Sequence, residues 1–215
     1  MKPIVIALTG EAHSGKDTCA DYLVERFNSE NLFAIKVCLA DKLKLVCQKL
    51  VKLFYNIEIP LGEFYDIQEK EKIRNLYPEF AGQPFKLRTV LQQVGTEVFR
   101  DLLWATVWCD YIKKTKIANC KQKIIIISDC RYLDEIQYFE ELVFDQLINF
   151  FISCRITREN KTQLSVENRN HLSELQISSL PVNLEIQNNG TFDDLYQKID
   201  EKVVDYIKNK IMEFQ

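Results

Sequence analysis

Residues 10–18 have the types and spacing of a phosphate-binding loop. They read Gly-Glu-Ala-His-Ser-Gly-Lys-Asp-Thr and lie between an apolar run at 4–8 and an amphipathic helical pattern. Glycines let such a backbone curl, so that its N–H groups and the N-terminus of the next helix face an anion. Lys16 is placed to reach the outer phosphates of a nucleotide. The segment therefore predicts nucleotide binding, with Gly10 and Ser14 in the loop that faces the phosphates.

One position departs from the common form of this loop. Asp17 stands where a magnesium-binding Ser or Thr normally sits, and Thr18 follows it. An anionic carboxylate would hold Mg²⁺ more strongly than a hydroxyl does, or would hold it through a water molecule. Asp17 is therefore a candidate metal ligand.

Three charged residues follow an isoleucine run in the second half of the chain. Asp129 comes just after residues 124–127, and Arg131 and Glu135 are spaced to share one face of the next helix. An acid at the carboxyl end of a buried strand, beside a phosphate loop, is where the second carboxylate of a magnesium shell belongs. The plainer interpretation is a helix-capping Asp with a surface ion pair. The neighbouring loop favours the functional interpretation, with Asp129 as a metal ligand.

Residues 86–100 form an amphipathic helix pattern at about 100° per residue. Arg88, Gln92, Gly95 and Thr96 gather on the side opposite to the apolar residues Leu87, Val90, Leu91, Val94 and Val98. A mid-helix glycine costs roughly 1 kcal/mol relative to Ala, which suggests that something needs close access there. Either the helix lines a substrate cleft, with Arg88 binding a phosphate and Gln92 binding a base or sugar, or its polar face is simply exposed to solvent. In the second case the glycine is there for packing. The pattern alone does not decide.

Three further segments have both a functional and a plain interpretation. Trp104 and Trp108 stand four apart on the next expected helix, a pair more typical of a core than of a base-stacking platform. Arg155 and Arg158 close an apolar run before the polar stretch 159–172, which fits either a lid over ATP or a solvated loop. Residues 188–191, Asn-Asn-Gly-Thr, read as a turn with Thr191 as helix cap, in a location that can also border an adenine ring.

These residues need elements that bring them together, and the chain supplies five apolar runs separated by helical stretches. The runs cover 4–9, 33–38, 123–128, 149–156 and 182–186. Continuous rather than alternating apolar runs suit parallel strands that are covered on both faces. We therefore expect an α/β fold of three layers, a five-stranded parallel sheet with helices on both faces. The last helix should bury Leu195, Ile199, Val203, Ile207 and Ile211.

Composition narrows the function classes. The 215 residues carry a net charge of −3 with both signs interspersed, and the lack of a basic tract argues against a polymeric nucleic acid as partner. The apolar runs are too short for a membrane span, and the chain begins without the pattern of a signal peptide. Seven scattered cysteines favour reduced thiols and a cytoplasmic location, and two histidines without clustered ligands do not favour a zinc site.

Taken together, these segments resemble the phage-type deoxynucleoside monophosphate kinases, within the nucleoside monophosphate kinase-like P-loop superfamily. The matching elements occur in the family's order across nearly the whole chain. They are Ser14-Gly15-Lys16-Asp17-Thr18, Ala40-Asp41-Lys42-Leu43-Lys44, Arg88 through Leu91-Gln92 to Gly95-Thr96, Asp129-x-Arg131, His171-x-Ser173-Glu174 and Asn189-Gly190-Thr191.

The resemblance implies a P-loop NTPase fold and transfer of the ATP γ-phosphoryl group to the 5′-phosphate of a deoxynucleoside monophosphate (dNMP), with Mg²⁺. It implies a single domain over residues 1–215, with a core at 1–38 and 120–215, a helical acceptor-binding insertion at about 39–119 and a lid at about 157–175. The residues implied to serve ATP are Gly15, Lys16, Asp17, Thr18, Arg131, Glu135 and Asn189. Those implied to contact the deoxynucleotide are Lys44, Arg88, Gln92, Gly95, Thr96, Trp108 and Asp129. Lys16, Arg131 and Arg158 would neutralise charge on the transferring group.

Two departures from the family limit what carries over. Ala12 and His13 stand where family loops have basic residues, and the acceptor insertion is shorter, so the base preference does not transfer. Two alternatives stay open: a P-loop kinase of another small phosphorylated metabolite, such as phosphomevalonate or dephospho-coenzyme A, and a nucleotide-binding switch without acceptor chemistry. A homodimer is compatible with the sequence.

Overall fold

The chain folds into two compact units. The computed structural model describes residues 2–74, 85–118, 121, 123–159 and 176–213. We call residues 1–38 with 112–215 the core unit and residues 39–111 the insertion unit.

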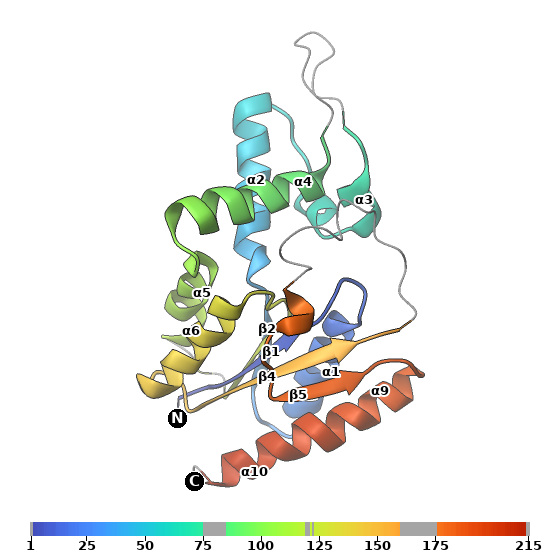
Figure 1. Ribbon diagram of the computed structural model, residues 1–215, viewed down its shortest axis with the longest axis vertical. Coiled ribbons are helices and arrows are strands. Elements are labelled where there is room, and N and C mark those ends of the chain that lie inside the picture. Colours follow the sequence, from blue (N-terminus) through green and yellow to red (C-terminus); the bar gives the residue numbers. More distant parts are fainter. Residues whose placement is uncertain (1, 75–84, 119–120, 122, 160–175, 214–215) are drawn as a thin grey trace. The chain divides into compact units, whose positions relative to one another are not determined.

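A parallel sheet forms the centre of the core unit (Figure 1). Its strands are β1 (Ile4–Thr9), β2 (Ala34–Val37), β3 (Ile124–Ile127), β4 (Phe150–Thr157) and β5 (Leu184–Gln187), in the spatial order β2-β3-β1-β4-β5. Each strand coincides with one of the five apolar runs, and its ends differ from those of the run by no more than two residues. The sheet order places the carboxyl end of β1 between those of β3 and β4, so the loop after β1 meets residues from both neighbours.

Helices cover both faces of this sheet, which confirms the expected three layers. On one face lie α1 (Lys16–Ser29), α9 (Phe192–Ile199), the π-helical turns Asp200–Val204 and α10 (Asp205–Glu213). On the other face lies α6 (Leu133–Phe144), whose Phe139 ring stacks on that of Phe151 in β4 at a centroid distance of 5.9 Å. The core unit is completed by the π-helical segment Lys113–Ile117 and the 3₁₀ turn Ile177–Ser179.

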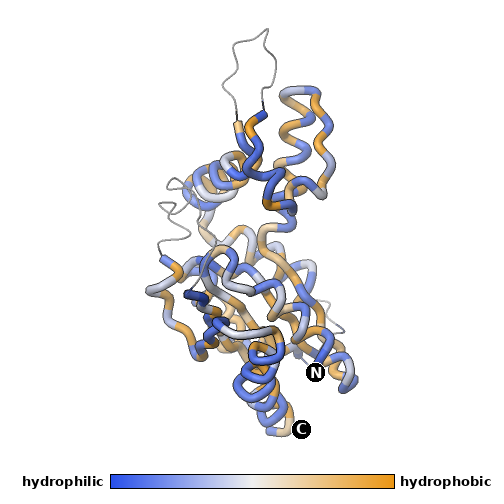
Figure 2. The backbone as a smooth tube through the Cα atoms, turned by 90° about the vertical axis from the view of Figure 1, so that its right-hand side faces the viewer, coloured by the Kyte–Doolittle hydropathy of each residue, from blue (hydrophilic) through white to orange (hydrophobic). Residues whose placement is uncertain are grey.

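The C-terminal helical run has the amphipathic character that its spacing predicts. The five apolar residues expected on its inner face are all buried against the sheet and α1. Figure 2 shows hydrophilic and hydrophobic stretches alternating along this run. Among the helices that the structure describes, none combines the length and the apolar character of a membrane span.

The insertion unit is built from helices. They are α2 (Ala40–Tyr55), the 3₁₀ turn Leu61–Phe64, α3 (Ile67–Glu71), α4 (Leu87–Gln92), the π-helical segment Gln93–Leu103 and the start of α5 (Val107–Ile112). Leu43, Cys47 and Val51 of α2 are buried, together with Phe64 and Leu87. An apolar stripe on α2 is therefore what this unit packs around.

The helical wheel for residues 86–100 is wrong from Gln93 onward. The chain changes there from α-helix to π-helix, which takes more residues per turn and so rotates a different set of side chains inward. Gly95 and Arg100 are buried, whereas Val98, expected on the apolar side, is 44% exposed. Leu87, which precedes the change, is buried as expected.

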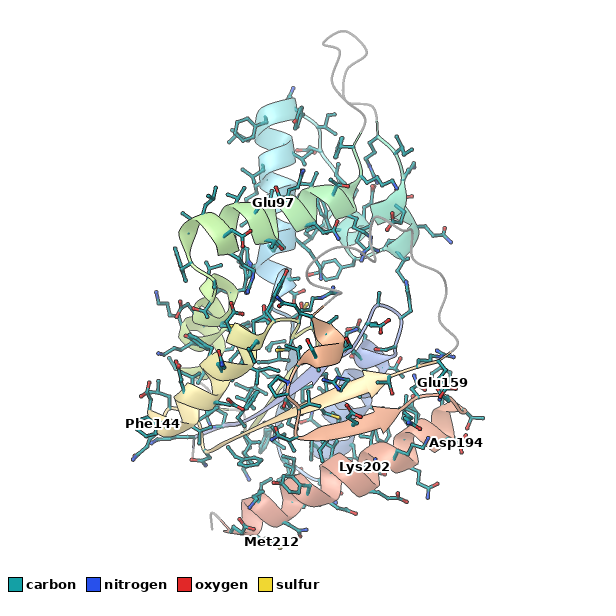
Figure 3. The ribbon with its side chains drawn as sticks, in the orientation of Figure 1. Glu97, Phe144, Glu159, Asp194, Lys202 and Met212 are labelled. Carbon is teal, nitrogen blue, oxygen red and sulfur yellow. The ribbon has the colours of Figure 1, made fainter. Side chains whose placement is uncertain are left out.

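The buried face of α1 offers a test of what stabilises the core unit. Phe27 is fully buried between α1 and the sheet, so Phe27→Ala should lower the free energy of unfolding by about 3–5 kcal/mol. Phe144, at the outer end of α6, is 89% exposed (Figure 3), so Phe144→Ala should change it by less than about 0.5 kcal/mol. Urea unfolding followed by circular dichroism measures both, and similar values for the two variants would contradict this account of the core.

Candidate active site

The phosphate loop leaves β1 at Thr9 and ends where α1 begins at Lys16. Its backbone takes left-handed φ angles of +146° at Gly10, +63° at His13 and +101° at Gly15. A Cβ at Gly10 would lie 2.3 Å from the Ile156 carbonyl oxygen in β4. Glycine at this position is therefore required both by the backbone angle and by close approach to the neighbouring strand.

Lys16 is buried within the loop. Its Nζ donates hydrogen bonds of 2.7 Å to the carbonyl oxygens of Gly10 and of Glu11. Both of these acceptors are backbone carbonyls, and the two hydrogen bonds fix the direction of the side chain. This arrangement suits a group that neutralises phosphate charge.

The turn after β5 reaches the back of the phosphate loop. Asn188, 7% exposed, donates from Nδ2 to the Ser14 carbonyl oxygen at 2.9 Å. Asn189, the residue expected to serve ATP, accepts the Glu159 N–H at Oδ1 over 3.0 Å. The sequence predicts Asn188 within the turn 188–191, but not this contact with the phosphate loop, although its place directly after β5 was a usable signal.

Thr191 caps α9 as expected. Its Oγ1 accepts the Asp194 N–H at 3.2 Å, and Asp194 Oδ2 accepts the Thr191 N–H at 2.9 Å. The latter hydrogen bond lowers the pKa of the Asp194 carboxyl. Figure 3 shows Glu159 and Asp194 near the carboxyl ends of β4 and β5. The cap fixes how the chain turns from Asn188 into α9.

Asp17 faces a lysine of β2. Its Oδ1 lies 2.9 Å from Lys36 Nζ, which is also 3.0 Å from Asp21 Oδ1. Burial lowers the pKa of the Lys36 ammonium, but the hydrogen bonds and charges of the two carboxylates outweigh it and raise the pKa overall. Lys36 therefore remains protonated and partly neutralises the acid at the unusual loop position.

Asp129 lies just past the carboxyl end of β3. Its Oδ2 accepts the Cys38 thiol at 2.8 Å, and Cys38 follows β2. Asp17 and Asp129 are both carboxylate donors of the kind that Mg²⁺ prefers, and Mg²⁺ is usually held by one or two carboxylates together with the phosphates of a nucleotide. Each carboxylate is thus a suitable donor for a magnesium ion that binds together with a nucleotide, and their joint binding of one ion stays a prediction.

Glu135 has a structural role that the expectation of ATP contact did not include. Its buried Oε2 accepts the backbone N–H groups of Arg131 at 2.7 Å and of Tyr132 at 3.1 Å. This is the way a Glu at the third helical position satisfies the first amides of a helix. The carboxylate starts α6 and fixes the backbone from which the Arg131 side chain leaves.

A pocket of about 150 Å³ opens beside the phosphate loop within the core unit. Gly10, Glu11 and Ser14 line it on one side, and Arg155 and Glu185 on another. Arg155 is bound by the Glu185 carboxylate and the Leu180 carbonyl. Arg158, expected to neutralise charge on the transferring group, is exposed just beyond β4. Most of the expected lid, with His171, lies outside the described residues.

The expected acceptor cations of the insertion unit are paired with carboxylates. Arg88 Nε donates to Glu71, which also lies 3.6 Å from Lys86 Nζ. Lys44 Nζ lies 3.8 Å from the centre of the Tyr65 ring and 3.3 Å from Asp41 Oδ1. Gln92 and Thr96 are half-buried. The structure thus provides a cationic side chain on α2 and another on α4, each held by a neighbouring acid.

Gly95 is explained by packing. A Cβ there would lie 2.5 Å from Leu43 Cδ2, so the absent side chain lets the π-helical segment approach α2. The Gly95 carbonyl accepts the Trp108 Nε1–H at 3.4 Å, and the Trp108 ring, 7% exposed, packs against Phe99 at 5.0 Å. The space that Gly95 leaves is therefore used by side chains of the insertion unit itself. A contact between Trp108 and a base stays a prediction.

The two tryptophans do not share a helix. Trp104 precedes α5 in extended backbone and is 49% exposed, whereas Trp108 lies within α5 and is buried. Trp104 Nε1 donates to Asp110 Oδ2 at 2.9 Å. Sequence spacing alone therefore misjudged the pair, because the π-helical segment ends before Trp104.

The Gly95 contact predicts a substitution that should destabilise the insertion unit. Gly95→Ala should cost about 1–3 kcal/mol of unfolding free energy, because its methyl group overlaps Leu43. In a Leu43→Ala background the same change should cost less, because the colliding methyl groups are gone. Gly62→Ala is the matched control, since a Cβ there meets nothing within 4 Å. Urea unfolding of the four variants tests this, and additive effects of the two substitutions would contradict it.

Comparison with known proteins assigns the family. The family model "Deoxynucleotide monophosphate kinase" matches residues 44–199. A protein of Acanthamoeba polyphaga mimivirus, provisionally named a deoxynucleotide monophosphate kinase, is 24% identical over 207 residues, which cover 91% of this chain and 94% of the relative.

Among solved structures, the APS kinase of Mycobacterium tuberculosis in complex with AMPPNP and APS is 11% identical with a TM-score of 0.40, covering 93% of this chain and 96% of that one. Shikimate kinase of Aquifex aeolicus is 11% identical with a TM-score of 0.40, covering 91% and 93%. These structural likenesses are too weak to bear on function, but the family model spans most of the chain and agrees with the motifs: the protein belongs to the deoxynucleotide monophosphate kinase family.

Proposed function

We propose that this protein is an ATP-dependent deoxynucleoside monophosphate kinase, which transfers the γ-phosphoryl group of ATP to the 5′-phosphate of a dNMP and releases dNDP and ADP. The observation that carries the proposal is the buried Lys16, held by two loop carbonyls in a glycine-shaped phosphate loop, in a chain of this family. The substrates are small nucleotides, and no polymeric nucleic acid is involved.

The donor side of the reaction is assigned to the phosphate loop. Lys16 and the loop amides would hold the β- and γ-phosphates, with Thr18 at the start of α1 beside them. Asp17 and Asp129 would hold the Mg²⁺ that accompanies ATP, which neutralises phosphate charge. Asn189 would border the adenine ring from the turn after β5.

The acceptor side needs no general base. The 5′-phosphate of a dNMP is already anionic at neutral pH, so catalysis rests on positioning and on charge neutralisation. Arg88 would clamp this phosphate, since the planar guanidinium fork matches phosphate geometry. Glu71 binds the Nε of this guanidinium in the structure, so binding would exchange one anion for another.

The transferring group would meet two further arginines. Arg131 starts from backbone that Glu135 fixes, which limits the directions its side chain can take. Arg158 lies at the end of β4, where the expected lid begins. Both would neutralise charge that develops on the phosphoryl oxygens.

The main alternative is a kinase of another small phosphorylated acceptor, of the phosphomevalonate or dephospho-coenzyme A type, and a switch without an acceptor is a second. Family membership supports the nucleotide. A panel of dNMPs and NMPs, phosphomevalonate and dephospho-coenzyme A with ATP, read as ADP release, separates them. We expect fast ADP release only with dNMPs. A rate of ADP release that no dNMP increases would contradict the proposal.

Lys16→Ala should lower turnover by at least about a hundredfold, because it removes the charge held at the phosphates. Arg131→Ala should have an effect of similar size. Lys202→Ala is the matched control, since its ammonium binds the Glu185 carbonyl on the outer face of the core unit (Figure 3). Coupled ADP-release assays measure all three, and near-normal turnover of Lys16→Ala would remove its assigned role.

Arg88→Ala should raise the KM for dNMP about tenfold or more while the KM for ATP changes little, because only the acceptor phosphate loses its clamp. Arg74→Ala is the control within the same unit, since Arg74 binds Glu63 and Glu69 and has no assigned ligand. Arg74→Ala should lower the stability of the protein, but it should not raise the KM for dNMP more than the KM for ATP. Equal changes in both KM values for Arg88→Ala would contradict the assignment.

A further inference from the structure

Asn188 ties the carboxyl end of β5 to the phosphate loop. Its backbone N–H donates to the Thr157 carbonyl of β4 at 2.8 Å, which fixes the residue beside the end of that strand. Its side-chain amide then donates to the Ser14 carbonyl at 2.9 Å in a buried environment. The contact joins residues that are 174 positions apart in the chain.

This hydrogen bond sets the direction of one loop amide. In a trans peptide the C=O and the N–H of the same unit point in opposite directions. Because Asn188 holds the Ser14 carbonyl toward β5, the Gly15 N–H of that peptide unit points away from β5. Backbone N–H groups aligned in this way at the start of a helix form an anion-binding concavity.

Gly15 and Asn188 depend on each other. Gly15 has a φ of +101°, and a Cβ there would lie 2.4 Å from Asn188 Nδ2. The amide therefore fills space that only glycine leaves open. Asn provides a neutral hydrogen-bond donor of the required length. Asp would place an acceptor against the Ser14 carbonyl, and Ala would remove the donor that this carbonyl bonds to.

We propose that Asn188 is a positioning residue that holds the phosphate loop in its anion-binding form and thereby sets the affinity for the triphosphate of ATP. The inference rests on the proposed function only in taking ATP as the donor. It differs from a contact with the base, the role that the location of this turn first suggested, because it acts through the Ser14–Gly15 peptide.

The test compares two ligands and four proteins by isothermal titration calorimetry. The ligands are ATP and inorganic tripolyphosphate, which has the phosphates without the base. The proteins are the wild type, Asn188→Ala, Asn188→Asp and the control Asn183→Ala. Asn183 directly precedes β5 and also bonds to β4, since its Oδ1 accepts the Ser153 N–H at 2.8 Å, but it lies at the opposite end of β5 from Asn188.

We expect Asn188→Ala to lower the affinity for ATP and the affinity for tripolyphosphate by the same factor. That factor should be about tenfold, the effect of losing one buried hydrogen bond. Asn188→Asp should weaken both further, and the KM for dNMP should stay unchanged. Asn183→Ala should lower the thermal unfolding midpoint while both affinities stay at wild-type values. If Asn188→Ala does not fold, Asn188→Ser replaces it, because a hydroxyl keeps a donor in a smaller side chain and should give an intermediate loss.

Three outcomes would overturn the proposal. The first is an Asn188→Ala variant with wild-type affinity for tripolyphosphate but weakened affinity for ATP, which would indicate a contact with the base. The second is unchanged affinity of Asn188→Ala for both ligands. The third is an equal loss of affinity in Asn183→Ala, which would indicate a general effect on stability. Tripolyphosphate binding does not depend on the acceptor. A wild-type protein that binds it but phosphorylates no dNMP would therefore contradict the proposed function alone.

Discussion

The close approach of the strand ends to the phosphate loop is the constraint on which the donor site depends. Gly10 leaves room for the Ile156 carbonyl of β4, and Gly15 leaves room for the Asn188 side chain after β5. Both glycines also take backbone angles that other residues rarely adopt. The loop's curvature is thus imposed by the sheet behind it as well as by its own sequence. The same backbone shape therefore does not depend on basic residues at the positions of Ala12 and His13.

The layers of the core unit could be predicted because burial on both faces of a sheet leaves a direct mark on the sequence. Continuous isoleucine and valine runs gave all five strands, and the spacing from Leu195 to Ile211 gave the inner face of the last helix. The insertion unit was harder to predict for a physical reason. A wheel assumes one rotation per residue, and the change from α-helix to π-helix after Gln92 moves Gly95 inward and Val98 outward.

The candidate site shows a similar division between local and long-range contacts. The phosphate loop and the Thr191 cap are encoded by neighbouring residues, so the sequence shows them. Glu135 and Asn188 act through backbone groups, and the Asn188 partner lies far away in the chain. The spacing of Arg131 and Glu135 suggests a shared helix face, but Glu135 binds the amides where that helix begins. The partner of Asn188 is a backbone group 174 positions away, so no local sequence pattern reveals this contact.

Paired charges lie at two of the places where we propose that a phosphate binds. Lys36 faces Asp17 at the phosphate loop, and Glu71 faces Arg88 in the insertion unit. Each pair holds a charged group in one direction, although Glu71 would have to leave Arg88 before an acceptor phosphate could bind there. The first pair also accounts for the unusual loop residue. A carboxylate in place of a hydroxyl adds a negative charge beside a triphosphate, and the Lys36 ammonium offsets it. In the proposed function, Asp17 would thus act as a magnesium ligand without a matching loss of attraction for ATP.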